Sequence, residues 1–140
     1  MSRYVVDASA GVKWFLPEPG AADAVRLQNP AFELHVPAFF DLELANIFWK
    51  AVRQSRLTRA DADVRLTQLA ALSLLRHPEG PFVTAAFDIA DRAGRTVYDS
   101  LCVALAAQLS AVLVTADDRL VNALVGTPWA ARVMRLTAVP

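Results

Sequence analysis

The chain has 140 residues, of which 55% are hydrophobic, and its 14 basic and 14 acidic side chains give a formal net charge of zero. This length suits one domain covering residues 1–140, and the balanced charge argues against a uniformly basic surface for polyanions. The longest apolar stretch, residues 101–116, is too short and too polar to cross a membrane, and Asp7 interrupts the first apolar run, so no secretory signal is expected. The single cysteine, Cys102, cannot form an intramolecular disulfide, which favours a reducing, cytoplasmic location.

Apolar periodicity and turn residues predict alternating strands and helices in the first half of the chain. The expected strands are residues 3–6 and 34–36, and the expected helices are 9–15, 21–28, 38–54 and about 58–74. Asp7 follows the first strand, Pro37 closes the second, and Thr58 is placed to cap the last helix. On that helix, Asp61 and Arg65 are spaced to form an ion pair.

The second half continues the same alternation. The expected strands are a short one near the turn-rich break at 77–81, then 111–115 and 132–136, and the expected helices are 84–93, 97–109 and 117–125. Gly94 ends the first of these helices, and the spacing of Asp88 with Arg92 and of Asp91 with Arg95 predicts two exposed ion pairs on it. Strands that alternate with helices imply an α/β fold with a mainly parallel sheet.

Four carboxylates are placed to meet at one end of this sheet. Asp7 follows the first strand directly, and Asp117 lies two residues after the strand at 111–115. Glu43 and Asp99 lie near the starts of two helices, where carboxylates are stabilised by the helix dipole. Because ligands of open parallel sheets bind outside the carboxyl ends of the strands, we expect these four side chains to share one crevice.

Carboxylates in one crevice repel one another, by roughly 1 kcal/mol per pair in water and roughly 4 kcal/mol at an effective dielectric of 20 for charges 4 Å apart. Such a cluster persists by sharing protons or by binding a divalent cation, and oxygen ligands suit Mg²⁺ or Mn²⁺. The chemistry that follows is metal-assisted hydrolysis of a phosphodiester, which needs no protein nucleophile.

Each carboxylate also has a structural interpretation. Asp7 could form a turn in which Ser9 caps the first helix, and Asp99 could complete a capping box begun by Thr96. Glu43 alone could be a solvated helix charge. The functional interpretation therefore depends on the joint placement of the four acids.

Neighbouring polar residues refine this picture. If Thr115 caps the helix at 117–125, the cap would use Asp118 and leave Asp117 free. Asn46 follows Glu43 by three positions and therefore shares its helix face.

Four segments carry a resemblance to a known family: residues 5–9 (Val-Val-Asp-Ala-Ser), 37–46, 98–106 and 113–120 (Leu-Val-Thr-Ala-Asp-Asp-Arg-Leu). In this order and spacing they resemble the PIN-domain family, and within it the VapC-type toxins of toxin–antitoxin pairs. The resemblance covers nearly the whole chain. It implies a three-layer α/β/α sandwich and an endoribonuclease that depends on Mg²⁺ or Mn²⁺.

The resemblance also implies roles for individual residues. The catalytic, metal-binding quartet would be Asp7, Glu43, Asp99 and Asp117. Supporting residues would be Ser9, Thr115, Asn46 and Asp118. The resemblance further implies a homodimer, a VapB-like antitoxin as inhibitor and structured RNA as substrate.

RNA that approaches a carboxylate crevice needs basic residues around it, and Lys13, Arg92, Arg95 and Arg119 are the nearest in sequence. One alternative function is a non-enzymatic PIN-like scaffold. Another is a phosphotransfer or phosphatase domain, which also places an aspartate at a strand end. The phosphatase pattern fits poorly, because Ser9 stands where such sites carry a second acid.

Overall fold

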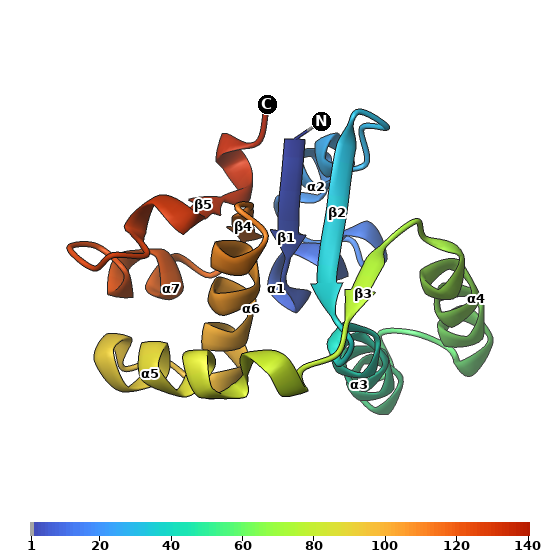
Figure 1. Cartoon of the computed structure of the whole chain (residues 1–140). Helices are drawn as coiled ribbons and strands as arrows, with labels where there is room; N and C mark the ends of the chain where they lie inside the picture. The colour runs from blue at the N-terminus through green and yellow to red at the C-terminus, as the bar shows by residue number, and fades with distance from the viewer. Residues whose placement is uncertain (1) are drawn as a thin grey trace.

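A computed structural model describes residues 2–140 and contains one five-stranded sheet (Figure 1). The strands are β1 (Ser2–Val6), β2 (Phe32–Pro37), β3 (Leu75–His77), β4 (Val112–Thr115) and β5 (Val133–Arg135). They are all parallel and lie in the order β3-β2-β1-β4-β5. The chain builds the sheet outward from β1 in one direction and then in the other, so the strand order reverses between β1 and β4. That reversal is where parallel α/β sheets place their ligands.

Helices cover both faces of the sheet. They are α1 (Ala8–Gly11), α2 (Ala21–Leu27), α3 (Phe40–Arg53), α4 (Arg59–Ala71), α5 (Val83–Ala93), α6 (Val97–Gln108) and α7 (Asp118–Ala123). Short 3-10 turns occur at Val12–Trp14, Gly80–Phe82, Ala130–Arg132 and Leu136–Ala138. In Figure 1 the strands point toward α3 and α5, and both chain termini lie at the opposite end of the sheet. The predicted three-layer α/β/α arrangement is confirmed.

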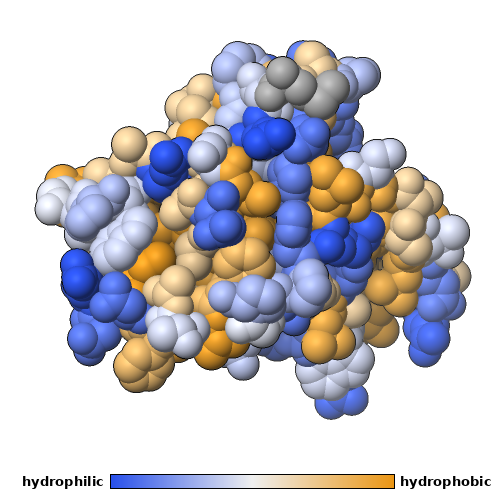
Figure 2. Space-filling view, in the orientation of Figure 1, coloured by the Kyte–Doolittle hydropathy of each residue, from blue (hydrophilic) through white to orange (hydrophobic). Residues whose placement is uncertain are grey.

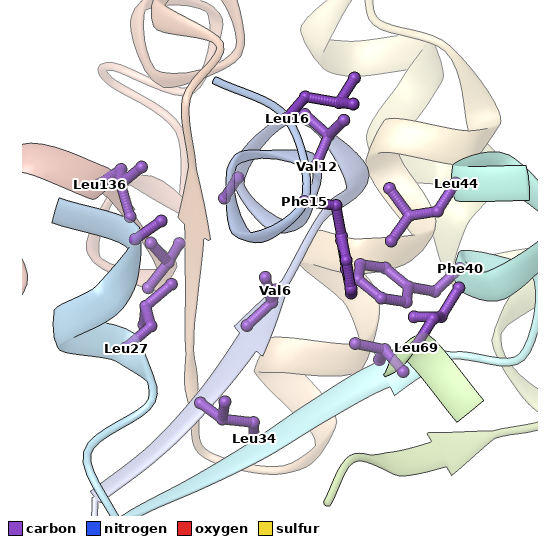
Figure 3. Close-up of a cluster of buried hydrophobic side chains, with 14 of the residues drawn as sticks. Val6, Val12, Phe15, Leu16, Leu27, Leu34, Phe40, Leu44, Leu69 and Leu136 are labelled. Atoms are coloured by element: carbon purple, nitrogen blue, oxygen red, sulfur yellow. The ribbon is translucent and has the colours of Figure 1, made fainter. Parts of the chain in front are cut away.

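One hydrophobic core lies between the sheet and the helices α1 to α4. Val6 of β1 and Leu34 of β2 face Leu27 of α2 and Phe40 of α3, as Figure 3 shows. Gly11 brings α1 close to α3: a Cβ atom at this position would lie only 2.5 Å from the ring of Phe40. The helix that follows Asp7 and the helix that carries Glu43 are therefore packed directly together.

A second core lies on the opposite face, beneath α5, α6 and α7. Val5 of β1 and Leu113 of β4 contact this cluster, because successive residues of a strand face opposite sides of the sheet. Helix α6 is buried over most of its length from Ser100 to Ala106, which explains its nearly continuous apolar sequence.

The predicted elements are all present, but some local details were wrong. Pro37 is the last residue of β2 and pairs with His77 rather than standing outside the strand. Thr58 does cap α4, but Asp61 completes a capping box with Thr58 instead of pairing with Arg65. The guanidinium of Arg65 donates instead to main-chain oxygens, including that of Phe15 at 3.0 Å.

The surface in the view of Figure 2 mixes hydrophobic and hydrophilic residues without one continuous apolar belt. In the part of the chain that the structure describes, no helix is long and apolar enough to span a bilayer.

Candidate active site

Asp7 lies at the carboxyl end of β1, beside the end of β4, and is buried. Its carboxylate accepts hydrogen bonds from the hydroxyls of Ser9 at 2.7 Å and Thr115 at 2.5 Å. It also accepts from the main-chain N–H of Ala10 at 3.0 Å, so that it caps α1. The turn predicted for Asp7 and Ser9 is therefore present, but Asp7 itself is the cap and Ser9 supports it.

Burial raises the pKa of Asp7 to about 6, although the bonds from Ser9, Thr115 and Ala10 work in the opposite direction. The nearby charge of Asp99 adds to the rise. Burial therefore outweighs the three hydrogen bonds that favour the ionised carboxylate.

Glu43 lies in the first turn of α3. Burial raises its pKa to about 7, and the charges of Asp7 and Asp99 raise it further. Three of the four predicted carboxylates therefore interact electrostatically. The edge-to-face contact of Phe39 with Tyr98, with ring centroids 5.6 Å apart, joins the start of α3 to the start of α6 and holds Glu43 and Asp99 on neighbouring elements.

Asp99 and Asp117 are connected through an arginine. One terminal nitrogen of Arg95 lies 3.3 Å from Oδ2 of Asp99 and 3.0 Å from Oδ2 of Asp117. Asp99 occupies the third position of α6, where its N–H donates to the capping hydroxyl of Thr96 at 3.1 Å. The cap predicted at Thr96 is present, while the Asp99 carboxylate turns toward Arg95.

The N-terminus of α7 differs from the prediction. Thr115 does not cap this helix: its hydroxyl donates to Asp7 and accepts from the N–H of Asp117 at 3.1 Å. Asp117 is the cap, because its Oδ1 accepts from the N–H of Arg119 at 3.0 Å. Asp117 is therefore not left free.

The remaining supporting residues divide into two groups. Asn46 lines, with Glu43 and Tyr98, an open hollow of about 520 Å³. Asp118 instead pairs with Arg135 at 2.9 Å and is not brought into the carboxylate cluster.

The basic residues predicted to surround the crevice make different contacts. Arg119 lies 3.6 Å from Asp117 and is largely exposed. Lys13 is engaged by Glu18 and by the main-chain oxygen of Pro19. Arg92 pairs with Asp88, as predicted, and lies over the ring of Trp129.

Arg95 is the site residue that the sequence only partly indicated. It was expected both near the rim and in an ion pair with Asp91, but it bridges Asp99 and Asp117 instead. Gly94, with a φ of 67°, ends α5 and redirects the chain just before Arg95, so helical spacing within α5 no longer applies there. Helical spacing could not predict the contact between Arg95 and Asp117, because α6 and β4 lie between them in the sequence.

The donor set fits a hard divalent cation in its chemistry. Asp7, Glu43, Asp99 and Asp117 supply only carboxylate oxygens, which Mg²⁺ and Mn²⁺ prefer, and the pKa values of Asp7 and Glu43 are raised by burial and by neighbouring carboxylates. Within residues 2–140, no three His, Cys, Asp or Glu side chains stand in the arrangement of a formed metal site. Arg95 contacts two of the four carboxylates, those of Asp99 and Asp117.

Comparison with known proteins assigns this chain to a family. The family model described as PIN domain matches residues 4–123. The chain belongs to the PIN domain family. The match includes all four predicted carboxylates, so the resemblance inferred from the four sequence segments is confirmed.

Curated relatives agree with this family. The chain is 35% identical to Ribonuclease VapC3 of Pyrobaculum aerophilum over 120 residues, which cover 84% of this chain and 92% of that protein. It is 37% identical to Ribonuclease VapC12 of Mycobacterium tuberculosis over 117 residues, which cover 83% of this chain and 88% of that protein.

Solved structures share the fold. The crystal structure of PAE2754 from Pyrobaculum aerophilum superposes with a TM-score of 0.72 and 25% identity, covering 96% of this chain and 84% of that one. The crystal structure of FitAcB from Neisseria gonorrhoeae superposes with a TM-score of 0.64 and 15% identity, covering 96% of this chain and 99% of that one, and shows likeness of fold alone.

Proposed function

We propose that this PIN domain is an endoribonuclease that hydrolyses RNA phosphodiester bonds with the aid of Mg²⁺ or Mn²⁺, and that it acts as the toxin of a toxin–antitoxin pair. One observation carries the proposal: in a PIN domain, Asp7, Glu43 and Asp99 converge closely enough for the charge of Asp99 to raise the pKa values of Asp7 and Glu43, and for the charge of Asp7 to raise that of Glu43. The curated relatives are named as ribonucleases, which supports RNA as the substrate.

Asp7, Glu43, Asp99 and Asp117 would hold the metal. When bound, Mg²⁺ or Mn²⁺ supplies activation of the attacking water and offsets the charge on the phosphate. Ser9 and Thr115 orient the Asp7 carboxylate by hydrogen bonds, and the same hydroxyls tie the end of β1 to the end of β4. This pre-organisation removes the need to order Asp7 during catalysis.

A mechanism through a protein nucleophile is poorly supported. Cys102 is buried, and burial raises the pKa of its thiol well above the ordinary value, so the reactive thiolate is disfavoured. The ring nitrogens of His35 are both engaged, one by His77 at 2.8 Å and the other by Glu33 at 2.7 Å.

The proposed protein partners are a small VapB-like antitoxin and a second copy of the chain. Leu42 and Tyr98 are exposed by 73% and 68% and line the hollow beside Glu43, where an antitoxin segment could cover the carboxylates. Val83 and Phe87, exposed and one turn apart on α5, offer an apolar contact for a homodimer. Asn46 and Asp118 stay proposed as secondary site residues.

The test is cleavage of total RNA by purified protein that carries no bound inhibitor. We expect cleavage in Mn²⁺ or Mg²⁺, loss of cleavage in EDTA and loss in Asp7→Asn. Asp63→Asn is the matched control, because Asp63 lies exposed on α4 and pairs only with the neighbouring Arg59 at 2.9 Å. Cleavage that survives EDTA and Asp7→Asn would contradict the proposed site. No cleavage of any RNA with either metal would favour a scaffold role.

A further inference from the structure

Arg95 occupies a short connection between two helices that meet at the site. Gly94 ends α5 and Thr96 caps α6, so Arg95 is held at both ends by local backbone structure. Its side chain is only 21% exposed and extends between Asp99 and Asp117. The guanidinium is therefore placed inside the carboxylate cluster rather than on its rim.

The contact differs from an ordinary structural arginine pair. Arg76 binds both oxygens of Asp41 through two nitrogens, at 2.6 and 3.1 Å, which is the strong two-pronged geometry. Arg95 instead uses one nitrogen for two carboxylates, and its buried Nε has no hydrogen-bond partner. A buried donor left without a partner is unfavourable, so the two charge-assisted bonds to Asp99 and Asp117 must offset the cost of burying Nε.

At Asp117, Arg95 contacts the carboxylate oxygen that the helix cap does not use. Oδ1 of Asp117 is taken by the cap of α7, where it accepts from the N–H of Arg119. Oδ2 of Asp117, which has no role in the cap, accepts from Arg95. A cation that bound Oδ2 of Asp117 would therefore leave the start of α7 intact but would share this oxygen with the positive charge of Arg95.

We propose that Arg95 is a built-in counter-ion of the metal-free site, which positions Asp99 and Asp117 and competes with the divalent cation for their oxygens. This inference rests on the metal site of the proposed function. Two positive charges at the same carboxylates repel each other, and their coupling is reciprocal: a bound cation weakens the contacts of Arg95 with Asp99 and Asp117, and loss of Arg95 tightens cation binding by the same factor. Arg95 thus sets the metal concentration at which the site fills.

The first test is calorimetric titration of Mn²⁺ into the metal-free protein, with circular dichroism to verify folding. We expect Arg95→Gln to bind Mn²⁺ about tenfold more tightly than the wild type. Arg119→Gln is the matched control, because it removes the same charge near the same carboxylate from a side chain that is 83% exposed. It should change the affinity by less than about twofold.

Different results of the titration would overturn the competition by Arg95 and the proposed metal site. Equal tightening in Arg95→Gln and Arg119→Gln would reduce the effect to general charge and overturn the competition, as would no tightening in Arg95→Gln. Absence of Mn²⁺ binding in the wild type would overturn the proposed metal site and the inference together.

A second measurement uses the wild type and so does not depend on how a variant folds. Side-chain nitrogen resonances of Arg95 should be distinct and exchange-protected without metal, and should become averaged when diamagnetic Mg²⁺ is added. Mg²⁺ that raises the melting temperature while leaving the Arg95 resonances unchanged would overturn the inference.

Discussion

The two halves of the carboxylate cluster are stabilised in different ways. Asp7 is buried at the end of β1 and is held by neutral donors, the hydroxyls of Ser9 and Thr115. Asp99 and Asp117 share a positive charge, that of Arg95. Glu43 lies with the first half, because burial and the charges of Asp7 and Asp99 raise its pKa and no arginine compensates them.

The difference shows two ways in which this chain reduces the repulsion between neighbouring carboxylates. In the half with Arg95, one positive charge offsets part of the negative charge of two carboxylates. In the half with Asp7 and Glu43, raised pKa values let protonation relieve part of the charge near neutral pH. The half with Asp7 and Glu43 is therefore the part of the site where a bound metal would replace the most protons.

The largest expected effect is the loss of RNA cleavage in Asp117→Asn, which distinguishes a metal ligand from a residue that only caps α7. Asparagine caps helices as well as aspartate does, so Asp117→Asn should keep α7 and melt within a few degrees of the wild type. Its RNA cleavage, measured as kcat/KM, should fall by roughly 10³-fold, the scale of losing a principal active-site group. Cleavage at wild-type rates would show that Asp117 serves only the cap.

A smaller loss is expected when the neutral donors of the other half are removed. Thr115→Val keeps the shape of the side chain and deletes the hydroxyl that holds Asp7. We expect cleavage to fall by about 10- to 100-fold, as is typical for groups that orient a ligand. Thr127→Val, which removes a hydroxyl bonded only to neighbouring main chain near Leu124, serves as the control and should retain activity. Equal losses in both would contradict the orienting role.

The free energy of unfolding in metal-free buffer should depend on pH through the charge of Glu43. The folded pKa values of Glu43 and Asp7 lie above their ordinary values, so the folded state binds more protons and stability falls as pH rises from about 4 to about 7. Glu43→Gln should raise the unfolding free energy by about 1–2 kcal/mol at pH 8 in EDTA, allowing for partial solvent screening, and by little at pH 5. Urea unfolding at both pH values measures this; a variant less stable than the wild type at pH 8 would contradict the assignment.

The smallest effect is expected at a pair outside the cluster. Asp88 and Arg92 are both exposed on α5 and lie 3.5 Å apart. Asp88→Asn should therefore lower stability by no more than about 0.5 kcal/mol and leave RNA cleavage unchanged. Thermal unfolding and the cleavage assay measure both quantities, and a large loss in either would show that α5 contributes more to the site than its contacts indicate.

The alternation of strands and helices, and the placement of Asp7 at a strand end, could be read from local apolar patterns, because each strand of a parallel sheet is buried and rich in β-branched residues. The convergence of Glu43 with Asp7 could be anticipated only from the order of motifs, since it depends on how α1 packs against α3 at Gly11. Local residue patterns predicted the strands and helices, but not how α1 packs against α3.

Contacts across the chain were the part that the sequence did not reveal. Asp91 with Arg95 and Asp61 with Arg65 have the spacing of helical ion pairs, yet Arg95 lies past the end of α5 and Asp61 is used by a capping box. In both cases the residue binds a different partner. Arg95 binds the carboxylates of Asp99 and Asp117, and Asp61 accepts from an N–H group at the start of α4 that would otherwise lack a partner.

The most direct test of the central claim is anomalous diffraction from crystals of this protein soaked in Mn²⁺. The account predicts an anomalous peak bound by Asp7 and Asp117, with Glu43 and Asp99 around it and the Arg95 guanidinium withdrawn from Oδ2 of Asp117. A well-occupied Mn²⁺ site elsewhere, with the four carboxylates metal-free and Arg95 still in place, would contradict it.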